Sequence, residues 1–343
     1  MSQKIVYVCE KPSLTKLFSE YAEQVHPHDE LYFINILTFG LHHFQYPRGL
    51  KHSDFPYLAN VKMKLNETQE PLVSMKQIIL FSQREQAYLK NNPYQQAIDV
   101  LQTADRIIFA CDDDYRSVVA FHHLLKETLG EEKALQQYEA IVLMLSTAQG
   151  VQDAVDRRLT THDDWYVSGR EYGLAKQYFD YNFNLNSFAI LGDALAFVGI
   201  DRARFHLSKY ILQAFYFVAQ HEGEFSSESE LYIGLHNWKG TGKYDPYKKY
   251  GLGSIISRSE ILLKLAESGL LEQRDRKIFL SSKGKVLLSV LHPDCCDLDL
   301  PFRIHDWCQD FEQSKPKMDR YLRTLFGKQK RYFAKQVQAL NVK

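Results

Sequence analysis

Two apolar segments of this chain end abruptly at carboxylates. Residues 4–9 are followed by Glu10, and residues 106–111 are followed by three consecutive aspartates. Runs that are apolar and β-branched throughout indicate strands covered on both faces, as in the parallel sheets of α/β proteins. Because parallel strands end at the same edge of a sheet, the pattern predicts that these acids gather where such sheets bind ligands. The alternative is that they are solvated strand ends or helix N-caps.

The composition excludes few classes of protein. Hydrophobic residues make up 45% and charged residues 24% of the chain, as in ordinary globular proteins. The five cysteines show no Cys-x-x-Cys spacing, and no apolar run reaches the length of a membrane span. We therefore expect a cytoplasmic protein without a disulfide framework, a zinc site or a membrane partner.

The formal net charge is zero, so a nucleic-acid surface must come from local charge asymmetry. Residues 314–343 supply it, with a single acid, Asp319, against the cations Lys315, Lys317, Arg320, Arg323, Lys328, Lys330, Arg331, Lys335 and Lys343. The interleaved aromatics are Tyr321, Phe326, Tyr332 and Phe333. This pattern is typical of base stacking, and equally of a terminal helix that packs its aromatic face.

Local patterns divide the chain into five parts. Residues 1–146 read as alternating strands and helices, which predicts a Rossmann-like, mostly parallel sheet. Residues 147–237 show helical periodicity, and the Gly- and Tyr-rich residues 238–253 are predicted to be a linker loop. Residues 254–313 read as helix, hairpin, helix, a winged-helix-like unit that binds nucleic acid in some proteins and is scaffolding in others. A basic tail, 314–343, follows. The predicted fold class is α/β plus α.

In this order the segments resemble one family, the type IA DNA topoisomerases, from residue 4 to about residue 313. Glu10-Lys11-Pro-Ser and the Asp-x-Asp at residues 112–114 are similar to the motifs of the family's Toprim domain. Residues 251–261, a Gly-Leu-Gly segment with Ser-Arg and Ile following, resemble a later family signature. The resemblance implies a Toprim fold that binds single-stranded DNA. It implies Glu10 as general acid/base, Lys11 on the phosphate, and Mg²⁺ held by Asp112 and Asp114, with Asp113 as a fallback ligand.

Two departures from the family bear on function. The family's nucleophilic tyrosine and its gate domains belong between the segments 199–222 and 251–261, where this chain is too short to hold them. Tyr46-Pro47-Arg48 resembles the tyrosine motif only superficially and lies in the Toprim-like region. No nucleophile is therefore identified.

The second departure is in the metal motif, where Arg116 replaces the third acid. This exchange of charge weakens the predicted Mg²⁺ site. Alternatively, the Arg116 guanidinium replaces the metal by pairing with the acids and contacting phosphate directly. Helical cations elsewhere are predicted to line a DNA groove, or else to be solvated helix surface: Arg170, Arg202, Arg204, Lys209 and Arg258.

Together these features predict a topoisomerase-like protein that binds single-stranded DNA but does not cleave it alone. It would act as an accessory to another DNA-processing protein. Two alternatives remain open. The first is an Mg²⁺-dependent Toprim nuclease, which needs no tyrosine because water attacks. The second is a topoisomerase whose tyrosine gate lies on another chain.

Overall fold

The computed structural model describes residues 2–36, 44–63, 73–75, 97–238, 244 and 251–341. The chain divides into two compact units, one of Met1–Gln45 with Lys62–Leu174, the other of Tyr46–Val61 with Ala175–Lys343. The division falls inside one continuous helix, α7 (Asp164–Asn186), and so lies later in the chain than residue 146, the first boundary expected from the sequence. Among the described residues, no helix is both long enough and apolar enough to cross a membrane.

The first unit is built on a six-stranded sheet. Its strands are β1 (Lys4–Cys9), β2 (Glu30–Asn35), β3 (Val73–Met75), β4 (Arg106–Asp112), β5 (Glu139–Leu143) and β6 (Leu159–Thr160). They lie in the order β3-β2-β1-β4-β5-β6, in which β2, β1, β4 and β5 are parallel and the two edge strands are antiparallel. The predicted mostly parallel sheet is confirmed.

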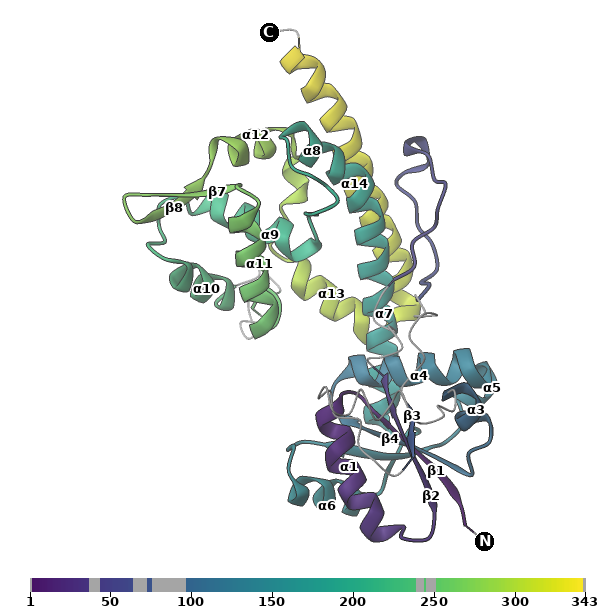
Figure 1. Cartoon of the computed structure of the whole chain (residues 1–343). Coiled ribbons are helices and arrows are strands. Elements are labelled where there is room, and N and C mark those ends of the chain that lie inside the picture. The colour runs from purple at the N-terminus through teal and green to yellow at the C-terminus, as the bar shows by residue number, and fades with distance from the viewer. Residues whose placement is uncertain are drawn as a thin grey trace, which may run out of the picture. The chain divides into compact units, whose positions relative to one another are not determined.

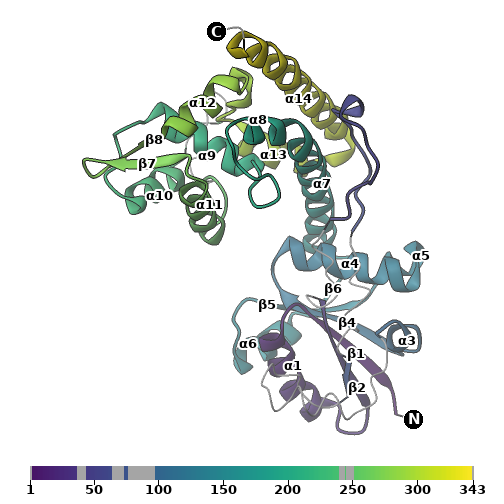
Figure 2. The same cartoon turned by 45° about the horizontal axis from the view of Figure 1, so that its top comes forward.

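Helices cover both faces of this sheet, which explains why its strands are apolar throughout. One face packs on α1 (Pro12–Val25) and α6 (Ala148–Asp156), and the other on α3 (Ala97–Gln102), α4 (Tyr115–Leu129) and the start of α7 (Figures 1 and 2). The short helix α5 (Glu131–Ala134) follows α4. Alternate residues of each strand enter the two cores.

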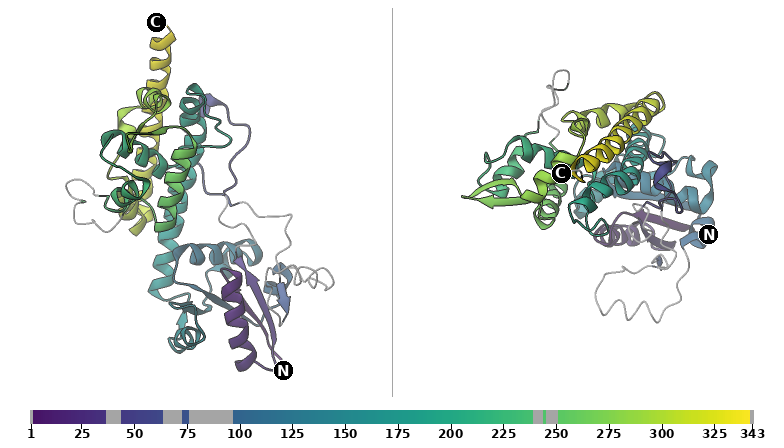
Figure 3. Two further views of the ribbon diagram at one scale, coloured as in Figure 1. Left: turned by 60° about the vertical axis from the view of Figure 1, so that its left-hand side comes forward. Right: turned by 90° about the horizontal axis from the view of Figure 1, so that it is seen from above.

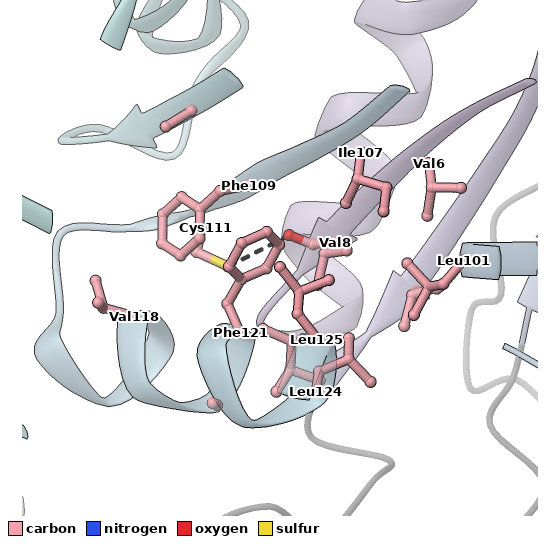
Figure 4. Close-up of a cluster of buried hydrophobic side chains, with 14 of the residues drawn as sticks. Val6, Val8, Leu101, Ile107, Phe109, Cys111, Val118, Phe121, Leu124 and Leu125 are labelled. Carbon is pink, nitrogen blue, oxygen red and sulfur yellow. Dashed lines mark hydrogen bonds between the residues drawn. The ribbon is translucent and has the colours of Figure 1, made fainter. Parts of the chain in front are cut away.

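Figure 4 shows the core on the α4 face. Phe109 of β4 meets Phe121 of α4 edge to face, with ring centroids 5.3 Å apart. The Cys111 thiol donates a hydrogen bond to the carbonyl of Val8, 3.4 Å away, and both residues are fully buried. Burying one such aromatic side chain contributes roughly 1.5–3 kcal/mol to folding. These contacts fix the mutual position of β1 and β4.

The connections change direction between β1 and β4. From β1 the chain passes through α1, on one face, to β2 on one side of β1. From β4 it passes through α4, on the opposite face, to β5 on the other side. The carboxyl ends of β1 and β4 therefore flank a topological switch point, where open α/β sheets bind ligands.

Among its described residues, the second unit is mostly helical, with one hairpin and the largely irregular segment 46–61. After a π-helical turn η3 (Ser187–Leu191) its helices are α8 (Gly192–Phe197), α9 (Lys209–Gln220), α10 (Glu228–His236), α11 (Ile255–Glu267), α12 (Ser282–Val290), α13 (Leu300–Gln309) and α14 (Phe311–Asn341). The hairpin, β7 (Leu271–Arg274) and β8 (Lys277–Leu280), lies between α11 and α12. The predicted order of helix, hairpin and helix is confirmed, and the winged-helix assignment stays a prediction.

The basic C-terminal segment forms a helix that packs on this unit. Helix α14 runs beside the last turns of α7 (Figure 3), with Met318, Leu322 and Phe326 fully buried. The ring of Phe326 lies 5.2 Å from that of Phe183 on α7. For Phe326 the packing alternative is therefore correct.

Most of the predicted linker, residues 238–253, lies outside the described residues. Three described positions in it are buried: Trp238, Tyr244 and Leu252. The Trp238 indole donates to the carbonyl of Leu298, 2.7 Å away, and the Tyr244 ring stacks on Phe302. The described part of this segment is thus anchored in the second unit.

Candidate phosphate-binding site

Three charged side chains meet where β1 and β4 end. The register pairs Cys9 with Ala110, so Glu10 and Lys11 leave the sheet beside Asp112. The Lys11 Nζ atom lies 3.0 Å from Asp112 Oδ2 and 3.6 Å from Glu10 Oε2. The ammonium group therefore lies within ion-pair distance of both carboxylates.

Glu10 and Asp112 share a partly buried site, and burial affects the two unequally. Burial, and then the hydrogen bond and charge of Asp112, raise the pKa of Glu10 to about 7. Burial opposes ionisation of Asp112 too, but its hydrogen bonds with Glu10 and Lys11 hold its pKa below the usual value. As the pH falls toward 7, Glu10 is therefore the member of the pair that takes up a proton first.

Asp114 has a structural role and an electrostatic one. Its side chain caps α4 by accepting from the backbone N–H of Arg116 at 2.9 Å. The Arg116 guanidinium also donates to it, with Nε at 2.9 Å and a terminal nitrogen at 2.8 Å. The Arg116 side chain is nevertheless 74% exposed, and Asp113 faces solvent. The N-cap alternative is thus correct for Asp114.

The acids of the predicted Mg²⁺ site are paired with side-chain cations in this structure. Within the described part of the chain, no group of three or more His, Cys, Asp or Glu side chains is placed to hold a metal. Lys11 lies against Asp112, and Arg116 lies against Asp114. Mg²⁺ requires oxygen ligands in near-octahedral geometry. For Asp112 and Asp114 to bind it, their ion pairs with Lys11 and Arg116 would have to break. The weakened Mg²⁺ site and its alternative, in which Arg116 takes the place of the metal, both stay predictions.

Helix termini add partial positive charge at this edge of the sheet. Helices α1, α4 and α6 each begin within a few residues of the carboxyl end of β1, β4 or β5. The partial positive charge of each helix therefore lies at the edge that carries Lys11 and Arg116. The buried Ser117 hydroxyl also donates to Asp112, 3.4 Å away. Its place in the first turn after the acids is the only sequence signal that indicates this contact. The edge thus places three helix N-termini and two cations beside four acids.

The predicted groove cations are distributed over both units. Arg170, half-buried on α7, belongs to the first unit. Burial, with smaller contributions from His123 and Arg170, lowers the pKa of His122 to about 4. Arg202 and Arg204 are exposed in the second unit, within 3.9 Å of Asp193 and 3.7 Å of Asp201 respectively.

Two of the predicted groove cations are buried instead of facing solvent. The Lys209 side chain is 8% exposed and pairs with Asp180, and burial lowers its pKa to about 8. Arg258 is 4% exposed; it donates to the carbonyl of Gly253 at 2.7 Å and lies over the Tyr232 ring. In this structure both residues make their contacts inside the second unit.

Tyr46, the superficial match to the tyrosine motif, belongs to the second unit. Its ring stacks on Tyr181 at 5.1 Å, and burial raises its pKa to about 12. A phenol in that state is a poor nucleophile at neutral pH.

A scan against protein-family profiles finds no match to this chain. A search of curated proteins likewise finds none with significant similarity.

Proposed function

We propose that this chain is a Toprim-type protein, related to the type IA topoisomerases, that binds single-stranded DNA without cleaving it by itself. The observation that carries the proposal is the meeting of Glu10, Lys11 and Asp112 at the switch point of the sheet. In the proposed role, Lys11 and Arg116 donate charge-assisted hydrogen bonds to the oxygens of a backbone phosphate. Their carboxylate partners hold both cations in position.

The proposed lack of cleavage rests on two parts that the family's reaction requires and that this chain has no identified counterpart for. Strand passage in this family needs a tyrosine that attacks the phosphodiester bond and domains that form a gate. The segment that should hold them is too short, and Tyr46 is partly buried with a raised pKa. A protein that keeps the phosphate-binding edge but lacks the gate is suited to an accessory role beside another DNA-processing protein.

Binding of a labelled oligothymidine, measured by anisotropy across a salt series, tests the proposal. We expect salt-sensitive binding that Arg116→Ala weakens by roughly threefold to tenfold, about 1 kcal/mol. Lys126→Ala is the matched control, because Lys126 lies at the far end of the same helix and pairs with Glu131. Equal binding by both variants, or relaxation of supercoiled plasmid by the purified chain alone, would contradict the proposal.

A second candidate, a Toprim nuclease, is favoured by one observation. Because the pKa of Glu10 is about 7, this residue can hold a proton at neutral pH and donate it to a leaving oxygen. Plasmid nicking that Glu10→Gln abolishes would support the nuclease over the non-cleaving protein. Relaxation seen only when another polypeptide is added would support a topoisomerase divided between two chains.

A further inference from the structure

A separate pocket lies between α13 and α14 in the second unit. It has a volume of about 320 Å³. Helix α13 contributes Arg303 and Trp307, one turn apart, and α14 contributes a stripe at spacings of three and four residues: Lys317, Tyr321, Thr324 and Lys328. Arg320 lines it as well. Side chains at these spacings lie on one face of a helix, so two helix faces form the walls.

The pocket has an excess of positive charge. Four cations line it against a single carboxylate, Asp294, which Lys328 binds. Arg303 is also balanced, since Asp297 lies at 3.5 Å and Asp299 at 4.0 Å. Lys317 and Arg320 are exposed, and neither forms an ion pair with another of the described residues. These two side chains are therefore available for an anion from solution.

The other side of the pocket is aromatic. Trp307 and Tyr321 lie with ring centroids 5.5 Å apart at an angle of 62°, and the Trp307 ring is only partly buried. Phe179 supports the indole at 5.8 Å, so its position is fixed before any ligand binds. A preformed, partly exposed indole is a stacking surface for a planar ring, and stacking of a base contributes roughly 1–3 kcal/mol.

We propose that this pocket binds a single nucleotide, with its base against Trp307 and its phosphate on Lys317 and Arg320. The volume lies at the lower end of the range for small-molecule sites, about 300–1,000 Å³, which suits one nucleotide better than an extended acidic peptide. An exposed aromatic ring beside two neighbouring cations is an arrangement that recognises nucleotides. The pocket belongs to one unit and does not depend on the sheet-edge site.

The fluorescence of Trp307 reports on binding directly. The full-length chain is titrated with deoxyadenosine monophosphate and, separately, with a short oligothymidine. We expect each ligand to quench the tryptophan fluorescence, and we expect this quenching to be lost in Trp307→Phe. Lys317→Ala combined with Arg320→Ala should weaken binding roughly tenfold and lower the salt slope for the oligonucleotide by about 1.4. Arg323→Ala is the matched control, since Arg323 is exposed on the same helix but does not line the pocket.

Each outcome has a defined meaning. Binding of the mononucleotide alone identifies a site for free nucleotides, and binding of the oligonucleotide alone identifies a strand contact; both support the proposal. Unquenched Trp307, or equal effects of the pocket and control variants, would overturn it. So would polyglutamate binding that the same variants weaken while neither nucleotide quenches. Arg116→Ala should leave the quenching intact, so this proposal and the sheet-edge proposal fail separately.

Discussion

Two buried asparagines on α7 attach the segment 46–61 to the second unit. Asn186 accepts from the backbone N–H of Tyr57 at 2.7 Å and donates to its carbonyl at 2.7 Å. One turn earlier, Asn182 makes the same pair of bonds with Ala59, at 2.8 and 3.0 Å. Each asparagine amide therefore satisfies both backbone groups of one residue in the segment, as a neighbouring β-strand would. This arrangement predicts a local effect of mutation that can be measured residue by residue.

In Asn186→Ala the N–H and C=O of Tyr57 lose their partners. An unsatisfied buried backbone group costs about 1–3 kcal/mol, and Tyr57 is only half-buried, so the lower part of that range applies to each group. We expect the segment to open more easily by roughly 2–4 kcal/mol, which corresponds to about 30-fold to 1,000-fold faster amide exchange. Adding Asn182→Ala should cost less than the first substitution, because both residues hold the same segment.

Hydrogen exchange followed by mass spectrometry on peptides covering 46–61 is the assay. Asn60→Ala is the control, because Asn60 lies in the same segment with its side chain exposed, and it should leave exchange unchanged. Lys330 provides a second attachment through the carbonyls of His52 and Phe55, at 2.8 and 2.9 Å, so exchange near residue 52 should rise less. Unchanged exchange at residues 57–59 in the double variant would refute the reasoning.

Three further predictions concern charged residues. Arg258→Ala should destabilise the second unit by roughly 2–3 kcal/mol, measured by urea unfolding, because the hydrogen bond to Gly253 is lost. It should not weaken DNA binding by the folded protein. Weaker DNA binding without loss of stability would show instead that Arg258 contacts DNA. Arg116→Glu should bind Mg²⁺ more tightly than the unaltered chain, as measured by calorimetry, because a third carboxylate then joins Asp112 and Asp114. No increase in Mg²⁺ affinity would count against the view that Arg116 excludes the ion. In EDTA, Glu10→Gln should be more stable than the unaltered chain above pH 7 by up to roughly 3 kcal/mol, with no difference below pH 4.5. Burial, and then Asp112, raise the pKa of Glu10 from 4.5 to about 7 in the folded state, so the stability that Glu10 contributes falls as pH rises through that window. Parallel pH profiles of the two proteins would show that folding does not raise the pKa of Glu10.

Much of the first unit could be predicted from the sequence. Apolar runs such as residues 4–9 and 106–111 are buried almost throughout as central strands of a covered sheet, so the parallel core of the sheet follows from local pattern. The antiparallel edge strands β3 and β6 have no such signal. Glu10 and Asp112 then meet because parallel strands end at one edge. The hairpin between α11 and α12 was predictable for a similar reason, since a charged turn between short apolar runs is a local signal.

The charged residues of helices could not be assigned in this way. Lys209 and Arg258 look like the exposed Arg202 and Arg204 in the sequence, because a long cationic side chain is compatible with either environment. Burial of Lys209 depends on Asp180, 29 residues earlier, and burial of Arg258 on the loop around Gly253. Segment 46–61 was likewise expected in the first domain, whereas Asn182 and Asn186 bind it to the second unit.

The sequence by itself determined the central strands, the edge where they end and the kinds of charge that arrive there. Only the tertiary structure decided which charges neutralise one another: Lys11 with Asp112, Arg116 with Asp114, and Lys209 with Asp180. The physical reason is range. Hydrophobic periodicity is a property of residues close together in the sequence. The burial and pairing of a charge depend instead on which distant side chain the fold places within a few ångströms of it.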